Sequence, residues 1–273
     1  MDVMLRRSDT RLTTTNVRRL DLPHNDITHV NSIHCSDDVT AIHDLDLSNN
    51  RIELIERSSL VAFKSLIQLD LSRNRIEHIA ANGFSCSLAK LQRLNLAGNR
   101  LQRLDVLWLY PLQNLRHINL SANTITHISD SVAVNVSQRR GGADGGGDGG
   151  GGGDGACLPR YSSYSDEQSP EYQISQLTAW AQLSGVDLSH NNITHIPARL
   201  FKRFLKHSKH LSLAHNRLTS LPADEIEHLQ RLEVIDLSFN VIDWLDVGTF
   251  SNPRLKSINL SHNRLKKLIS MTF

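Results

Sequence analysis

The chain has 273 residues, and its 30 lysines and arginines nearly balance its 28 aspartates and glutamates, which leaves a formal net charge of +2. Charged residues are spread along the chain without the basic stripe that would favour nucleic acid as a partner. No apolar run is long enough for a membrane-spanning helix, and the N-terminus lacks the apolar core of a signal peptide. The three cysteines, Cys35, Cys86 and Cys157, are odd in number and widely spaced, which supports neither a disulfide framework nor a zinc site.

After a polar segment over residues 1–16, one pattern begins and recurs along the chain. Its clearest copy is IHDLDLSNNRIELI over residues 42–55, which reads L-x-x-L-x-L-x-x-N-x-L-x-x-L. The first half alternates apolar and polar residues as a strand does, and the second half turns at the asparagine. Such a segment buries one edge only, so we expect it to be stable only where neighbouring copies stack on it.

Nine copies share the asparagine, at consecutive separations of 25, 24, 25, 24, 68, 25, 24 and 23 residues. A period near 24 in this frame is the leucine-rich-repeat signature. It predicts an α/β fold, a right-handed curved solenoid with a parallel β-sheet on the concave face and irregular turns with short helical pieces on the convex face. Phe63, Phe84 and Phe250 follow the frame and are predicted to fill the back of the stack. Because an amide side chain both donates and accepts, we predict a structural ladder of Asn25, Asn50, Asn74, Asn99, Asn123, Asn191, Asn216, Asn240 and Asn263.

The separation of 68 residues contains one repeat of 24 and 44 further residues. Residues 141–155 hold 11 of the 15 glycines, and such a tract loses too much backbone entropy to become ordered. We therefore predict repeats 1–5 over residues 17–128, a disordered insert over 129–176, and repeats 6–9 over 177–273, with the fifth and sixth repeats still stacked. A domain boundary at the insert is the alternative. The absence of recognisable caps, and a pattern that stops within a repeat at Phe273, lead us to expect a truncated sequence.

The polar positions between the strand leucines are predicted to point out of the concave sheet, the face with which solenoids usually bind partners. A solvated face without a partner is the alternative for any single residue. The second half of the face, with Asp187, His210 and Asp236, carries fewer charges. The ligand-binding candidates are therefore Arg18, Asp21, His43, Asp44, Asp46, Gln68, Asp70, Arg93, Asn95, Arg116 and His117.

No metal, cofactor or enzymatic activity is predicted. A column of aspartates and asparagines on the strands offers oxygen ligands of the kind that calcium prefers, but its regular spacing lacks ligands that converge. Histidine recurs in the slot before the repeat asparagine at His24, His190, His215 and His262, and we see no closed zinc geometry there. A surface that responds to pH near 6 is the alternative for the histidines. Motifs of nucleophilic hydrolases, P-loops and zinc proteases are absent from the sequence.

Four asparagines stand in N-x-S/T sequons and are glycosylation candidates if the protein is secreted. Two of these sequons follow almost automatically from the repeat pattern, whereas one lies in the insert. The four are Asn119, Asn135, Asn192 and Asn259.

The segments LDLSNNRIELI, LDLSRNRIEHI and VDLSHNNITHI, with the phenylalanines behind them, resemble the leucine-rich repeats of animal extracellular proteins. They are most similar to insect chaoptin-like adhesion proteins and Toll-like receptor ectodomains. The resemblance covers residues 17–273 apart from the insert. It implies a protein-interaction module of an extracellular or cell-surface glycoprotein, a receptor in signal transduction or a cell-adhesion protein, which binds a protein ligand or co-receptor on its concave face.

The chain departs from this family because it shows no cysteine-rich caps, no signal peptide and no membrane anchor. An intracellular scaffold, adaptor or regulatory subunit in the cytoplasm is therefore the alternative, and cysteines that look reduced would suit it.

Overall fold

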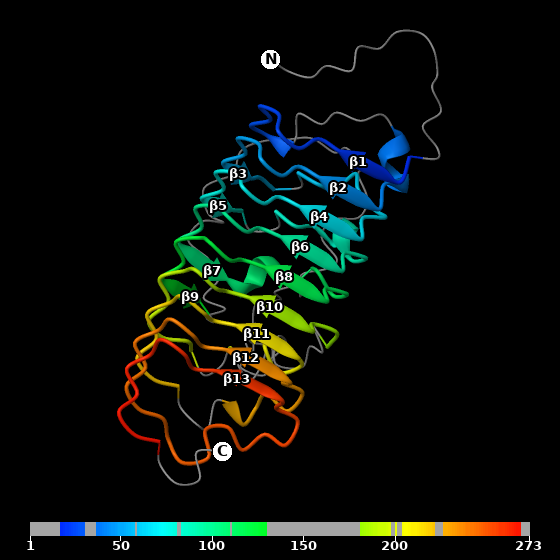
Figure 1. Ribbon diagram of the computed structural model, residues 1–273. Helices are drawn as coiled ribbons and strands as arrows, with labels where there is room; N and C mark the ends of the chain where they lie inside the picture. The colour runs from blue at the N-terminus through cyan, green and yellow to red at the C-terminus, as the bar shows by residue number, and fades with distance from the viewer. Residues whose placement is uncertain are drawn as a thin grey trace, which may run out of the picture.

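The computed structural model describes residues 17–30, 37–57, 59–80, 83–109, 111–129, 181–197, 200, 204–221 and 226–268. These residues wind into a stack of similar coils, one coil per repeat (Figure 1). The glycine-rich tract, Asn135 and Phe273 lie outside the described residues, so the predicted disorder of the insert and the predicted domain limits stay predictions.

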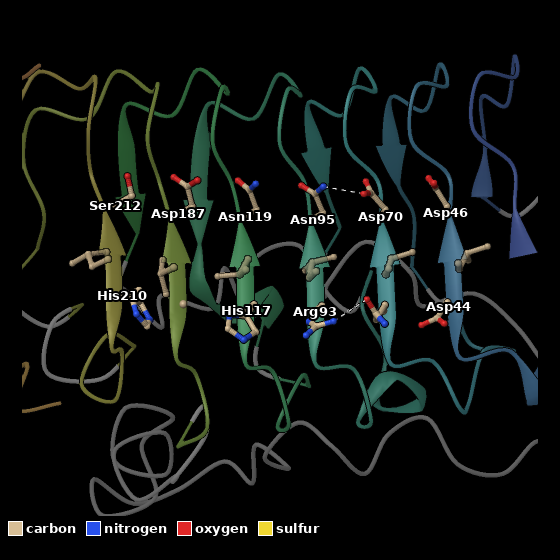
Figure 2. A pocket seen from close by; sticks show the side chains of 18 of the residues that line it. Asp44, Asp46, Asp70, Arg93, Asn95, His117, Asn119, Asp187, His210 and Ser212 are labelled. Atoms are coloured by element: carbon tan, nitrogen blue, oxygen red, sulfur yellow. Dashed lines mark hydrogen bonds between the residues drawn. The ribbon is translucent and has the colours of Figure 1, made fainter. Parts of the chain in front are cut away.

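One strand from each coil joins a nine-stranded parallel sheet in the order β1-β2-β4-β6-β8-β10-β11-β12-β13 (Figures 1 and 2). Each strand is the x-L-x centre of the repeat frame, and its middle residue faces the core while the flanking residues face outward. Equivalent positions pair between coils, as in Leu20 with Leu45 and Leu45 with Leu69. The predicted solenoid with a parallel sheet is confirmed. The strands are Arg19–Asp21 (β1), Asp44–Asp46 (β2), Gln68–Asp70 (β4), Arg93–Asn95 (β6), His117–Asn119 (β8), Gly185–Asp187 (β10), His210–Ser212 (β11), Val234–Asp236 (β12) and Ser257–Asn259 (β13).

In the described residues, the returning segments carry only short regular elements, as predicted. Two small parallel pairs form, β3 (Leu54–Ile55) with β5 (His78–Ile79), and β7 (Arg103–Asp105) with β9 (His127–Ser129). The 3₁₀ turns are η2 (Asp37–Ala41), η3 (Cys86–Leu88) and η4 (Val106–Leu109).

The core runs through the middle of the stack and consists of the repeat leucines and isoleucines, most of which are almost fully buried. The phenylalanines fill the back of the stack as predicted, because Phe63, Phe84 and Phe250 are all buried. Phe84 also contacts Trp108, with ring centroids 5.5 Å apart.

The coils on either side of the insert are neighbours in the sheet. Strand β8 pairs with β10 in register, with Ile118 opposite Val186. The Asn191 amide donates to the carbonyl of Leu120 (3.0 Å), and the N–H of Ile125 donates back to Asn191 Oδ1 (3.0 Å). The stack is therefore continuous across the position of the insert.

Cys86 at the start of η3 is part of a disulfide whose other cysteine lies outside the described residues. The cysteine spacing, which supported no disulfide framework, did not predict this single bond.

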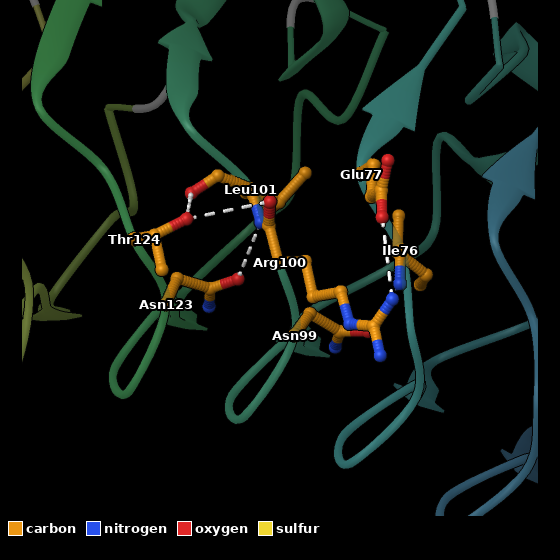
Figure 3. Close-up of polar contacts among 7 residues, drawn as sticks. All are labelled: Ile76, Glu77, Asn99, Arg100, Leu101, Asn123 and Thr124. Atoms are coloured by element: carbon orange, nitrogen blue, oxygen red, sulfur yellow. Dashed lines mark hydrogen bonds and ion pairs between the residues drawn. The ribbon is translucent and has the colours of Figure 1, made fainter.

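The repeat asparagines are buried from Asn50 to Asn240 and hold adjacent coils together. The Asn74 amide nitrogen donates to Leu71 O (3.0 Å) in its own coil and to Leu47 O (2.9 Å) in the preceding coil. Its Oδ1 accepts the N–H of Ile52 (3.0 Å). Figure 3 shows the acceptor half of this arrangement, where Asn99 and Asn123 accept from Ile76 and Leu101. Each asparagine thus satisfies backbone groups of two coils at once.

The residue before each repeat asparagine adopts a left-handed backbone conformation. We call these nine residues the turn column, and their N–H groups, from the first to the eighth, donate to a carbonyl of the next coil. The φ values of the eight non-glycine members lie between 53° and 56°, and that of Gly98 is 65°. The column consists of His24, Asn49, Arg73, Gly98, Ala122, His190, His215, Phe239 and His262.

Replacing Asn74 with alanine should lower the free energy of unfolding by about 1–3 kcal/mol, because it leaves buried carbonyl and N–H groups of two coils without partners. Chemical denaturation of the purified variant measures the loss. Asn25→Ala is the matched control, since Asn25 is exposed and its amide reaches only Leu22 and Pro23 in its own coil. An equal loss in both variants would contradict the role of the ladder between coils.

Candidate functional site: a polar hollow on the sheet

The outer face of the sheet forms an open hollow of about 660 Å³ that reaches from β1 to β12. Two rows of side chains line it on either side of the strand leucines (Figure 2). The leading row comes from the first residue of each strand and contains Arg19, Asp44, Gln68, Arg93, His117, Gly185, His210 and Val234. The trailing row comes from the third residue and contains Asp21, Asp46, Asp70, Asn95, Asn119, Asp187, Ser212 and Asp236.

Short hydrogen bonds fix most trailing-row side chains. Asp46 Oδ1 accepts the N–H of Ser48 (2.8 Å), and the same bond to the residue two positions on recurs at the other aspartates and asparagines from β4 to β13, in the manner of an Asx-turn. Asp70 additionally accepts from the Ser72 hydroxyl (2.6 Å) and from the amide of Asn95 (2.9 Å). These carboxylates therefore stand in set orientations on the sheet without a ligand.

The leading row is less constrained. The Arg19 guanidinium donates to Asp21 (2.9 Å), and this hydrogen bond and charge raise the pKa of Arg19. Arg93 donates to Gln68 at 3.3 Å. Both arginines are exposed, so these contacts contribute little to stability.

The lining of the hollow is acidic although the whole chain has a net positive charge. Six carboxylates line it against two guanidinium groups, together with two histidines. A hollow of this composition attracts groups that are cationic or rich in hydrogen-bond donors.

Gly185 interrupts the leading row and leaves a notch that His117 covers. A β-carbon on Gly185 would lie 2.6 Å from His117 Nδ1. Burial lowers the pKa of His117 below its ordinary value of 6.5, and the neighbouring charges of Arg93, His210 and Arg116 lower it further. The imidazole therefore stays neutral over the middle of the hollow at neutral pH.

Eight of the eleven residues predicted for ligand binding line this hollow, and Arg18, His43 and Arg116 do not. These three precede their strands by one residue, and their carbonyls accept the first N–H groups of the next coil, as in His43 N–H to Arg18 O (2.7 Å). The list of candidates omitted eight residues of the two rows, which occupy the same frame positions and could have been found by extending both rows to every repeat: Arg19, Asn119, Gly185, Asp187, His210, Ser212, Val234 and Asp236.

The sequon asparagines lie in different environments. Asn119 lines the hollow, where a glycan would occupy the space available to a ligand. Asn192 is half-buried beside the asparagine ladder, and Asn259 is exposed on β13. Within the described ranges, no three histidine, cysteine, aspartate or glutamate side chains are grouped so as to hold a metal ion.

The family comparison agrees with this geometry. The family model described as leucine rich repeat matches residues 40–101, 89–138 and 181–242, which together cover more than half of the chain. The chain belongs to the leucine-rich-repeat family. An array of this family is a protein-interaction module.

Each curated relative matches over part of its length. The chain is 38% identical over 100 residues to human Leucine-rich repeats and immunoglobulin-like domains protein 1, a segment covering 36% of this chain and 9% of that protein. It is 37% identical over 93 residues to mouse Tsukushi, covering 33% of this chain and 26% of Tsukushi. The matches therefore span well under two thirds of these relatives.

Solved structures share the fold at low sequence identity. A TLR13–ssRNA13 complex matches with a TM-score of 0.62 and 19% identity, over 93% of this chain and 34% of that chain. The APL1 leucine-rich repeat domain matches with a TM-score of 0.59 and 23% identity, over 89% of this chain and 49% of that chain. The predicted resemblance to Toll-like receptor ectodomains is thus confirmed at the level of the fold.

The matches are mostly to interaction modules, although the repeats also occur in an enzyme. The adenylate cyclase of Schizosaccharomyces pombe is 37% identical over 90 residues, which are 33% of this chain and 5% of that enzyme. None of the helices in the described part of the chain has the length and apolar character needed to span a membrane.

Replacing Gly185 with alanine should push the His117 ring out of the notch and raise its pKa toward 6.5, since burial is the largest cause of the lowered value. An NMR titration of the His117 ring protons measures this change. In the native protein the neutral, buried ring contributes to the free energy of unfolding above pH 6.5. This contribution is lost as the pH falls through the lowered pKa of His117 in the folded protein, and the variant should lose less of it.

Arg93→Gln is the control for Gly185→Ala, because it removes a neighbouring charge and leaves the ring buried. It should raise the pKa of His117 by a smaller amount. A His117 pKa that is unchanged in Gly185→Ala would contradict the packing of the ring against Gly185.

Proposed function

We propose that the repeats are the ligand-binding part of an extracellular or cell-surface receptor or adhesion protein, and that the polar hollow binds a basic segment of a protein partner. The observation that carries this proposal is the set of six carboxylates in the hollow, most of them held in fixed orientations by backbone N–H groups.

Preorganised carboxylates favour a partner with lysine or arginine side chains. An exposed ion pair contributes about 0.2–1 kcal/mol at most, so affinity in this hollow requires several pairs along the rows. Fixed orientation reduces the entropy lost on binding, and the acidic field steers a basic partner toward the face. The hollow thus supports recognition of a basic surface or strand better than that of an isolated cation.

The dimensions of the sheet favour a macromolecular partner. Nine strands at a spacing of about 4.8 Å give a face about 38 Å long. The hollow is open along this length, whereas small-molecule sites usually enclose most of the ligand. A protein surface or an extended peptide has the length to contact both ends.

The disulfide at Cys86 supports an extracellular location, because structural disulfides persist in oxidising compartments and are rare in the cytosol. The name of the human relative supports the same location, since immunoglobulin-like domains are common in cell-surface proteins. The name of another relative, mouse Transforming growth factor beta activator LRRC32, which is 33% identical over 114 residues, refers to the activation of a protein factor.

Panning a random peptide library on the immobilised protein tests the hollow directly, and we expect enrichment of peptides rich in lysine and arginine. The double variant Asp46→Asn/Asp70→Asn should weaken binding of an enriched peptide roughly 2- to 30-fold, as two exposed ion pairs are lost. Asparagine keeps the Asx-turn bond, as Asn95 and Asn119 do in the same row.

The matched control is Glu53→Gln/Glu77→Gln, which removes the same charge from exposed positions outside the hollow. Its peptide affinity should equal that of the native protein. Equal weakening in both double variants, or enrichment of acidic peptides, would refute the proposed specificity.

Treatment with an N-glycan-removing enzyme tests the location. The endogenous protein, tagged at its own locus, should lose mass on digestion, and Asn135→Gln or Asn259→Gln should remove part of that shift. A protein whose mass does not change would contradict secretion and favour the cytoplasmic scaffold.

A further inference from the structure

The C-terminal half of the turn column is a continuous stack of four rings. The centroids of His190 and His215 lie 4.0 Å apart, those of His215 and Phe239 4.1 Å, and those of Phe239 and His262 4.0 Å. The ring planes deviate from parallel by only 10–12°. The stack lies beyond the carboxyl ends of strands β10 to β13 and outside the polar hollow.

One of these rings occupies a position that does not favour it. Every non-glycine residue in the turn column has φ near +55°, a region in which histidine is enriched but a bulky residue such as phenylalanine is an outlier. Phe239 nevertheless stands there with 43% of its surface exposed. Strained and exposed aromatic positions of this kind point to a role in binding.

The stack has an open end at His190. One face of its ring covers His215, so the other face points along the column toward Ala122 in the preceding coil. The N–H of Ala122 donates to Ser189 O (3.0 Å), which fixes the two turns side by side. Ala122 is exposed, and its methyl group leaves the space in front of the His190 ring unfilled by the turn column.

The far side of this space is formed by Gly98 and the stem of Arg73. Gly98 has no side chain, and Arg73 Cγ lies 3.4 Å from where a β-carbon of Gly98 would stand. Two strand spacings, about 9.6 Å, separate the coil of Gly98 from that of His190. A ring stacked on His190 at the 4.0 Å spacing of the column would lie in this space, a slot above Ala122 that the turn column leaves open.

We propose that this slot above Ala122 binds an aromatic side chain of a protein partner. The partner's ring stacks on the free face of His190 and continues the column, and the stem of Arg73 covers its other face. Offset stacking between parallel rings contributes more to binding than the burial of their surface area alone. A cationic side chain over the face of a ring adds electrostatic attraction.

The surroundings favour a protein side chain over a nucleobase or a metal ion. Proteins that stack single-stranded bases do so along a positively charged groove. Charges of both signs are mixed here instead. Arg100 is paired to Glu77 at 3.3 Å, and Asp187 ends strand β10 three residues before His190. Parallel imidazoles 4 Å apart direct their ring nitrogens within separate planes, so two neighbours cannot share the tetrahedral geometry of a zinc site.

NMR of the whole chain with methyl-labelled alanine tests the slot, with N-acetyl-tryptophanamide as the probe. A ring above Ala122 shifts the Ala122 methyl resonance upfield, and we expect a shift that saturates with probe concentration. His190→Ala should weaken this binding about 2- to 12-fold through the lost stacking contact. Ala122→Trp should abolish it, because the new ring fills the slot and leaves the four native rings in place.

His24→Ala is the matched control, since His24 has the same backbone conformation at the opposite end of the turn column. It should leave the probe affinity unchanged. A shift that does not saturate, an equal affinity for N-acetyl-leucinamide, or binding that survives Ala122→Trp would each overturn the proposal. Tighter binding of adenosine monophosphate than of the tryptophan probe would overturn the assignment to a protein side chain.

Discussion

The structure depends on one buried amide in each repeat from Asn50 to Asn240. Where the chain leaves the sheet, the backbone turns inward and its carbonyls lose water, so each needs a donor within the protein. The repeat asparagine supplies two such donor bonds and accepts an N–H from the preceding coil, as Asn74 does with Leu47, Leu71 and Ile52. A side chain that bonds two coils fixes the offset between them. The sheet register therefore follows from the asparagine as much as from the strand leucines, which contribute packing but no direction.

A fixed register converts positions in the repeat into rows on the surface. Because every coil repeats the same geometry, residues at one frame position stand about 4.8 Å apart along the whole array. Packing in the core does not restrict which residue types stand at the surface positions. The trailing row carries carboxylates at many of these positions, and the C-terminal half of the turn column carries rings. The two rows lie three residues apart, as in Asp187 and His190 or Asp236 and Phe239, so one stack of coils presents two chemically different strips beside each other.

The repeat frame was sufficient to predict the parallel sheet and the buried phenylalanines, because these follow from a pattern that recurs in every copy. It was insufficient where the outcome depends on local geometry. Arg18, His43 and Arg116 stand two residues before the central residue of their strands, not in alternation with it, and the three-residue strands begin one position after them. The stacking of Phe239 between two histidines depends on contacts between coils, which the frame implies only once the offset of the coils is known.

The proximity of the two strips bears on how one partner would be recognised. Ion pairs over the hollow are individually weak and tolerate displacement along a row of similar carboxylates, so the acidic face alone would not fix the position of a basic segment. The proposed slot above Ala122, beside the free face of His190, has a single location along the array. If both proposals hold, the carboxylates supply attraction and the slot supplies the register of the partner. Specificity would then come from the distance between a basic and an aromatic residue of the ligand, a quantity that the rigid spacing of the coils sets.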